Sequence, residues 1–208
     1  MEKDRICDLI RKALTERILD GTYGAGDKLI ELHIAKEFGT SQAPVREALK
    51  ELESAGLVQS EPYRGTRVRA VSAREVRDAY FARGLLEQGA VESAVLNLQV
   101  HLGELRAVYE AMLQAARARD YAMQATCNHQ FHRMIVENSE NEVLLRLWDS
   151  LAFEARTRAR LNRPEADPEQ DVLSHLPILE AIEAGDSATA GLLLRNHANS
   201  FAPEVEEE

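Results

Sequence analysis

The chain has 208 residues, 45% of them hydrophobic and 29% charged, which is typical of a soluble globular protein with one or two cored domains. No apolar run reaches the roughly 18 residues that a membrane span needs, and the charged N-terminus lacks the apolar segment of a signal peptide. Cys7 and Cys127 are far apart and belong to no motif, which favours reduced thiols. We therefore expect a cytoplasmic protein with no membrane contact.

The net charge of −10 would by itself argue against nucleic acid, but it is unevenly distributed. Residues 1–70 hold 12 basic and 12 acidic side chains, whereas residues 71–208 hold 13 basic and 23 acidic ones. Within the first part, Arg46 and Lys50 lie close together, as do Arg64, Arg67 and Arg69. A locally basic face on a neutral domain is compatible with specific DNA binding, and the acidic remainder should disfavour loose binding.

The first predicted elements are two helices. Asp4 can cap a helix from Arg5 to about Leu19, in which apolar residues recur with the helical period until the glycines at 21, 24 and 26. Residues 30–38 predict a second, short helix with Ile34 and Phe38 facing inward. Gly39 and Thr40 then form a turn, which is the spacing of a helix–turn–helix.

The third predicted helix follows this turn. Ser41 is a good N-cap whose hydroxyl can accept a backbone N–H of the first turn, where the missing N–H of Pro44 costs nothing. Gly56 is a natural residue to end the helix. The apolar stripe between these two ends consists of Val45, Leu49, Leu52 and Ala55.

The exposed start of the third helix is suited to DNA, because the Gln42 amide and the Arg46 guanidinium can contact base edges and phosphates. Residues 57–61 and 66–69 predict two short strands with a tight tip at 63–65, so the whole is a winged helix–turn–helix. The predicted DNA-binding residues are Ser41, Gln42, Ala43, Pro44, Arg46, Lys50, Arg64, Gly65 and Thr66.

Residues 18–69 resemble the DNA-binding domain of the GntR family of bacterial transcription regulators. The resemblance implies a homodimer on a pseudo-palindromic operator in double-stranded DNA. Gln42 stands where relatives often have Arg, and because Arg prefers guanine and Gln prefers adenine, a different base is expected there. The matching residues are 18–21 (Ile-Leu-Asp-Gly), 26–29 (Gly-Asp-Lys-Leu), Glu31, Ile34, Ala35, Ser41, 44–49 (Pro-Val-Arg-Glu-Ala-Leu), Leu52, 56–58 (Gly-Leu-Val), Arg64 and Gly65.

The chain from Ser72 onward is predicted to be entirely helical, opening with a capping box at Ser72 and Glu75. The fold class is mainly α, with a winged helix–turn–helix domain at 1–70, an all-α bundle of about six helices at 71–202 and an acidic tail at 203–208. The expected helices are 73–98, 102–118, 121–137, 142–161, 172–184 and 187–201.

Four side chains of the bundle form a candidate metal site. Asn128 and His132 are four residues apart and share a helix face, whereas His129 points about 100° away. His175 opens the next-to-last helix and His197 lies on the last. Neutral imidazole is a common ligand of transition metals, although from the residues alone histidines without a metal are the commoner outcome.

These residues also resemble the FCD ligand-binding domain of the FadR-like branch of GntR regulators. The resemblance rests on 128–132 (Asn-His-Gln-Phe-His) with Asn141, on His175 with 178–182 (Ile-Leu-Glu-Ala-Ile), on 195–197 (Arg-Asn-His), and on Arg83 and Glu87. It implies a divalent transition metal such as Zn or Ni on Asn128, His132, His175 and His197, and a small carboxylate effector. Asn128 replaces the family's acidic ligand, so a weaker or altered metal site is expected.

The expected effector-binding residues are Arg83, Glu87 and Arg158. Arg83 can hold a carboxylate with two hydrogen bonds, but it can equally form a surface pair with Glu87, four residues on. Pro177 would disrupt a helix that began before residue 173, so Ser174 is the expected N-cap and His175 lies in the first turn.

The predicted function is a transcription regulator, a repressor working as a homodimer, whose operator binding responds to a small organic acid. The effector would favour a dimer geometry whose DNA-binding heads cannot reach both half-sites. Two alternatives remain at this point. One is a helical metalloenzyme fused to a DNA-binding head, and the other is a structural DNA-binding protein without an effector.

Overall fold

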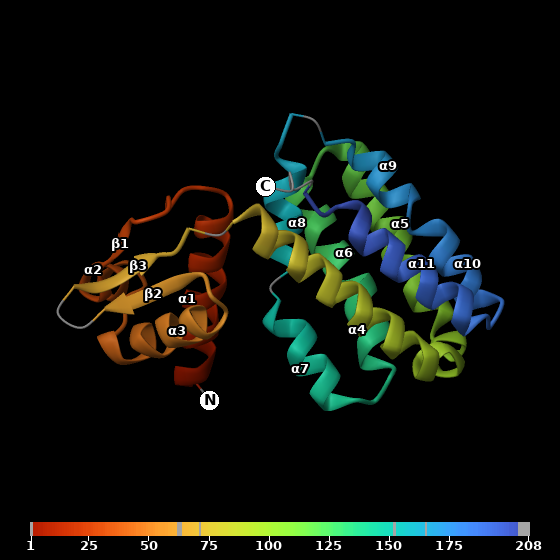
Figure 1. Cartoon of the computed structure of the whole chain (residues 1–208), viewed down its shortest axis with the longest axis horizontal. Coiled ribbons are helices and arrows are strands. Elements are labelled where there is room, and N and C mark those ends of the chain that lie inside the picture. The colour runs from red at the N-terminus through yellow and green to blue at the C-terminus, as the bar shows by residue number, and fades with distance from the viewer. Residues whose placement is uncertain (1, 62–63, 71, 152, 165, 204–208) are drawn as a thin grey trace. The chain divides into compact units, whose positions relative to one another are not determined.

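The computed structural model describes residues 2–61, 64–70, 72–151, 153–164 and 166–203 (Figure 1). The chain divides into two compact units, and the division falls between Ser72 and Ala73. Most of it is helical, with a small sheet in the first unit, as the sequence predicts. Within the described ranges, no helix combines the length and apolar character that crossing a membrane requires.

The first unit packs three helices against a three-stranded antiparallel sheet. The helices are α1 (Glu2–Leu19), α2 (Glu31–Glu37) and α3 (Gln42–Ser54), and the strands are β1 (Lys28–Leu29), β2 (Val58–Glu61) and β3 (Gly65–Val68). The strand order is β1-β3-β2. Helix α1 begins at Glu2, so Asp4 lies in its first turn and does not precede the helix as expected. Strand β1 has only two residues and was not predicted.

The ends of α3 explain its length. Ser41 is the N-cap, with extended backbone angles, but its hydroxyl does not make the expected bond to the helix N-terminus. At the other end Gly56 has φ +71°, a left-handed conformation that favours glycine. The N–H groups of Gly56 and Leu57 donate to Glu53 and Leu52 carbonyls, each at 2.9 Å. This pair of hydrogen bonds ends the helix, and the chain then turns into β2.

The second unit contains eight helices among its described residues, where six were expected. The prediction of 142–161 is wrong as one helix, because α7 ends at its C-cap Leu151 and α8 starts at Phe153. The prediction of 172–184 is likewise divided at Ser174 and His175. The helices are α4 (Ala73–Val100), α5 (Leu102–Ala118), α6 (Tyr121–Glu137), α7 (Glu142–Ser150), α8 (Phe153–Leu161), α9 (Pro168–Leu173), α10 (Leu176–Glu183) and α11 (Ser187–Ser200).

Close packing of α4 against α11 supports one side of the bundle (Figure 1). A Cβ added at Gly84 would lie 3.2 Å from the Cα and carbonyl oxygen of Arg195. Glycine therefore lets the two backbones approach closely. Helices α4, α5, α6, α10 and α11 share one apolar core, which includes the fully buried Leu98, Met112 and Phe131. The residues of the expected acidic tail beyond 203 lie outside the described part of the chain.

Candidate functional site

The start of α3 presents the polar face that the sequence predicts. Ser41, Ala43, Arg46 and Lys50 are exposed and Gln42 is half-buried. Pro44 is buried, so its side chain belongs to the core side of the helix. Arg46 Nε donates to Glu31 Oε2 at 2.7 Å, and its Nη2 donates to Gln42 Oε1 at 3.1 Å. The guanidinium is thus held between the two helices of the helix–turn–helix.

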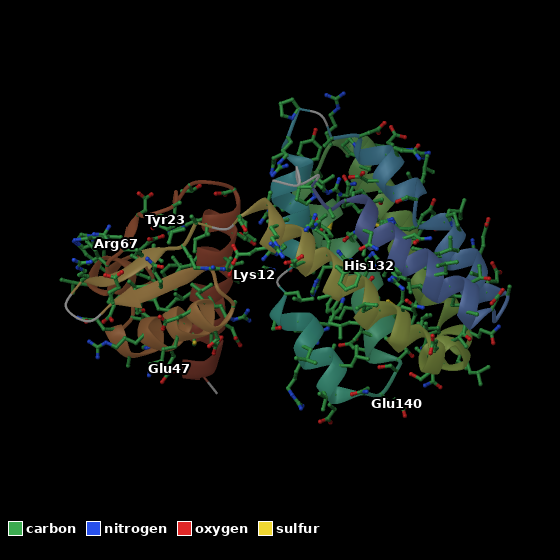
Figure 2. The ribbon with its side chains drawn as sticks, in the orientation of Figure 1. Lys12, Tyr23, Glu47, Arg67, His132 and Glu140 are labelled. Atoms are coloured by element: carbon green, nitrogen blue, oxygen red, sulfur yellow. The ribbon has the colours of Figure 1, made fainter. Side chains whose placement is uncertain are left out.

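The arginines of the wing have different surroundings. Arg64 is exposed and pairs with Glu61 at 3.1 Å. Arg67, labelled in Figure 2, donates to the carbonyl of Gly26 at 2.8 Å, and Arg69 Nε donates to that of Gly56 at 2.6 Å. Arg67 and Arg69 therefore tie the wing to the rest of the unit. Of the predicted wing contacts, Gly65 is exposed and Thr66 is half-buried, with its hydroxyl 3.0 Å from that of Ser60.

Three histidines from three parts of the chain meet inside the helical unit. His132 on α6, His175 between α9 and α10, and His197 on α11 are all buried. One ring nitrogen of each lies within 4.8 Å of one ring nitrogen of the others. Figure 2 labels His132 within the bundle. His129 points away from the three, as its helix position predicts, and its ring lies tilted against that of Trp148 with 5.0 Å between centroids.

The surrounding acceptors determine which nitrogen of each ring carries the proton. His132 Nδ1 lies 3.0 Å from Glu87 Oε2, and His175 Nδ1 lies 2.9 Å from the Asp171 carbonyl oxygen. Ser174 Oγ donates its single proton to that same carbonyl at 2.6 Å, so it accepts from His197 Nδ1 at 3.1 Å. An oxygen thus lies within 3.1 Å of each Nδ1, which favours the proton on that nitrogen and leaves Nε2 of each ring as a lone pair.

The electrostatics of the cluster keep these rings neutral. Burial lowers the pKa of His132, and it lowers the pKa values of His175 and His197 well below their usual range. The lone pairs of His132 Nε2 and His175 Nε2 then face each other at only 3.1 Å. Two such lone pairs repel unless a proton or a metal cation lies between them, and three converging imidazole nitrogens are a donor set that fits a divalent transition metal.

Asn128 is the fourth member of the expected site and is buried beside it. Its amide nitrogen lies 2.9 Å from His175 Nε2. Rotating the amide by half a turn would place Oδ1 in the same position, where it could serve as a ligand. The structure therefore brings together all four residues predicted to hold a metal.

Glu87 connects this cluster to two other helices. Its Oε1 accepts from Arg83 Nε at 2.7 Å and from Trp148 Nε1 at 2.8 Å, while Oε2 faces His132. Burial alone would raise the pKa of the Glu87 carboxyl, but Arg83 and then His132 outweigh it and lower that pKa to about 2. Glu87 is therefore a carboxylate that orients His132, a role that we did not predict.

Arg83 is buried beside the histidines, so the expectation of a surface pair with Glu87 is wrong: the pair is internal. Its Cζ lies 4.5 Å from the Phe153 ring centroid, and its buried Nη2 has no hydrogen-bond partner among the described residues. A guanidinium N–H in this position can donate to an oxyanion. Arg160 packs on Phe201, which contacts His197. Arg158 is two residues away and so lies on another face of α8, and its role in effector binding stays a prediction.

Sequence reasoning missed several residues that complete the site. Ser174 is the C-cap of α9 and not the N-cap of the next helix, which is His175. Pro177 still occupies the tolerated first turn. Ser174 and Trp148 act through long-range contacts that depend on packing, whereas Asp171 acts through its backbone carbonyl on His175, four residues on. Only Asp167-Pro168, an N-cap followed by proline, was a local signal that could have located α9.

A winged helix–turn–helix joined to a helical unit with a buried polar site is the architecture of a DNA-binding transcription regulator that carries a sensor domain. Residues 8–68 match the bacterial regulatory proteins of the gntR family, and residues 78–200 match the FCD domain. The chain belongs to the GntR family, with an FCD domain after its helix–turn–helix, and is a DNA-binding regulator and not an enzyme.

Relatives with known names are transcription regulators. A probable D-xylose utilization operon transcriptional repressor of Paenarthrobacter nicotinovorans is 34% identical over 98% of this chain and 90% of that protein. The gluconate operon transcriptional repressor of Bacillus subtilis (strain 168) is 26% identical over 93% of this chain and 82% of that protein. The solved structure of E. coli McbR/YncC has a TM-score of 0.76 and 25% identity, covering 94% of both chains. A putative GntR regulator from Rhodococcus sp. RHA1, at 23% identity and a TM-score of 0.72 over 96% of this chain and 94% of that one, has the same fold.

Proposed function

We propose that the protein is a cytoplasmic repressor that binds a pseudo-palindromic operator as a homodimer and responds to a small carboxylate held beside a divalent metal. The observation that carries this proposal is the set of three buried histidines whose ring nitrogens converge within 4.8 Å, each with an oxygen close to its Nδ1. Asn128 supplies the fourth donor, and the metal when bound acts as a Lewis acid that attracts a carboxylate oxygen. Zinc or nickel suits the three imidazoles.

Arg83 supports the second half of the proposal. Its buried Nη2 has no hydrogen-bond partner in the described part of the chain, and its charge adds to the burial that lowers the pKa values of His132, His175 and His197. A carboxylate that accepts from Nη2 would satisfy this donor. The names of two relatives, repressors of D-xylose utilization and gluconate operons, favour repression and make sugar acids the first compounds to try.

An exposed apolar stripe on α4 supports the dimer. Phe81, Leu85, Leu96 and Val100 lie within about 100° of arc on one face of this helix and are 43–81% exposed. Leu192 of α11 is 54% exposed. Such a surface is suited to a symmetric interface in which the same patch contacts itself. The dimer would present two α3 helices to two operator half-sites.

The experiment that tests the metal is elemental analysis of protein purified without added metal or chelator, with a thermal melt before and after EDTA. We expect close to one metal per chain and a melting temperature that falls after chelation. His132→Ala with His197→Ala should abolish the metal, whereas His101→Ala, at an exposed position on the same unit, should retain it. Metal retained by the double variant would mean that these histidines are not the ligands.

The experiment that tests the effector is operator binding titrated with gluconate and other small hydroxy acids, at fixed salt concentration. An effective acid should shift the operator Kd, and Arg83→Met should remove the shift while leaving operator binding intact. An operator affinity that stays unchanged with every metabolite and with the metal removed would favour a DNA-binding protein without an effector.

A further inference from the structure

The guanidinium of Arg46 is bound on the DNA-reading face before any DNA arrives. Arg46 Nε donates to Glu31 Oε2 at 2.7 Å, from the first turn of α2, and Nη2 donates to Gln42 Oε1 at 3.1 Å, one helical turn earlier on α3. The Arg46 side chain is 60% exposed and that of Glu31 34%. Two acceptors from two helices therefore fix one edge of an exposed guanidinium.

This contact determines the orientation of the Gln42 amide. The oxygen and nitrogen of a glutamine amide look alike, but arginine has donors only. The atom of Gln42 that faces Arg46 Nη2 must therefore be the oxygen. The Gln42 carbonyl oxygen accepts a hydrogen bond from the positively charged Arg46 guanidinium, so the NH2 group of Gln42 remains to donate to a base.

An amide in this state does not suit adenine. The two-bond glutamine–adenine pair needs the carbonyl to accept from the adenine amino group while the NH2 donates to N7. The carbonyl has a second lone pair, but an adenine amino group that used it would lie beside the positive guanidinium. Guanine offers two neighbouring acceptors, N7 and O6, to the NH2 group of Gln42 and to Arg46.

We propose that Gln42 and Arg46 act as one unit that reads a guanine, with Glu31 as the positioning residue of Arg46. This inference rests on the proposed operator binding and specifies its base preference. It replaces the adenine preference that the identity of Gln42 suggests when considered alone. Because the Arg46 guanidinium donates to the Gln42 carbonyl, the two side chains present only hydrogen-bond donors to the major groove.

The test is selection of duplex sites from a random library by the full-length protein and by Gln42→Ala. The base pair that loses its preference in Gln42→Ala is the one that Gln42 reads. We expect guanine there for the native protein, favoured over adenine by about tenfold in Kd on matched duplexes. Adenine at that position, or no position that depends on Gln42, would overturn the inference.

Two further variants distinguish an effect of Arg46 on base preference from a general loss of DNA affinity. Arg46→Leu, measured at low salt on duplexes carrying each of the four base pairs at that position, frees the Gln42 carbonyl and should shift the preference from guanine to adenine. A retained guanine preference would show that Arg46 does not orient the amide. Lys50→Ala is the control, which should weaken all four duplexes alike. If the native protein enriches no sequence, the proposed operator binding itself fails, and the base assignment fails with it.

Discussion

Glu87 shows how a single buried residue defines a site in which it is not a ligand. It accepts from Arg83 and Trp148 with one oxygen and faces His132 with the other, so it connects α4, α6 and α7. A carboxylate behind a metal-binding imidazole fixes the tautomer and makes the ring a better donor. The Glu87 carboxylate, 3.0 Å from His132 Nδ1, favours the proton on that nitrogen, so the lone pair of His132 Nε2 points toward His175.

Replacing this carboxylate should weaken metal binding without removing a ligand. Glu87→Gln keeps the size of the side chain but removes its charge, and we expect a loss of about 10–100-fold in metal affinity. Competition with a coloured chelator measures this affinity. Glu92→Gln, an exposed position on the same helix, is the matched control and should have no effect. An affinity equal to that of the native protein in Glu87→Gln would show that His132 is oriented by other contacts.

At Asn128 a substitution can add a negative charge to the proposed metal site. Asn128→Asp adds a charged oxygen beside His175 Nε2, so it should strengthen metal binding while destabilising the metal-free protein through an uncompensated buried charge. The gap between the melting temperatures with metal and after EDTA should therefore widen. Asn196→Asp, exposed on α11, adds the same charge away from the site and should leave the gap unchanged. A gap that narrows in Asn128→Asp would mean that residue 128 is not a ligand.

At the scale of elements, the apolar period located most helices because it depends only on local sequence. The helix predicted at 142–161 divides at Leu151, where no glycine or proline marks the end. The one predicted at 172–184 divides at Ser174, three residues before Pro177. Strand β1 escaped prediction because two residues carry no period. The histidines were found from their spacing and family resemblance. Ser174 and Trp148 were not found, because their contacts with His197 and Glu87 depend on how the helices pack. The Asp171 carbonyl lies four residues before His175, so that contact depends on where α9 ends.

The packing of α4 on α11 leads to a prediction about stability. Gly84→Ala gains helix propensity but forces a Cβ to within 3.2 Å of the Arg195 backbone, so the overpacking cost of about 1–3 kcal/mol should exceed the gain. Gly89→Ala on the same helix meets nothing within 4 Å and should stabilise by about 0.5–1 kcal/mol. Denaturant unfolding of the two variants compares them directly. A Gly84→Ala variant as stable as Gly89→Ala would show that the helices can separate without cost.

At the scale of the whole molecule, the proposed regulation requires two copies of the chain, because one recognition helix covers only one half-site. The α4 stripe of Phe81, Leu85, Leu96 and Val100 is where we expect the copies to meet. Leu96, 72% exposed in the single chain, would be buried in such an interface. A charge placed there would be buried against the apolar stripe of the other copy, so it would lose its hydration without gaining a partner.

Leu96→Glu should therefore yield a monomer whose metal content is unchanged and whose operator affinity is strongly reduced, because two-site binding is lost. Sedimentation equilibrium gives the mass, and an operator with a single half-site gives the second comparison. On that half-site the variant and the native protein should bind alike, since the α3 surface is intact. Leu147→Glu, on α7 and 53% exposed, is the matched control and should remain a dimer. A dimeric Leu96→Glu would place the interface on another face, and a monomeric Leu147→Glu would point to α7 as that face.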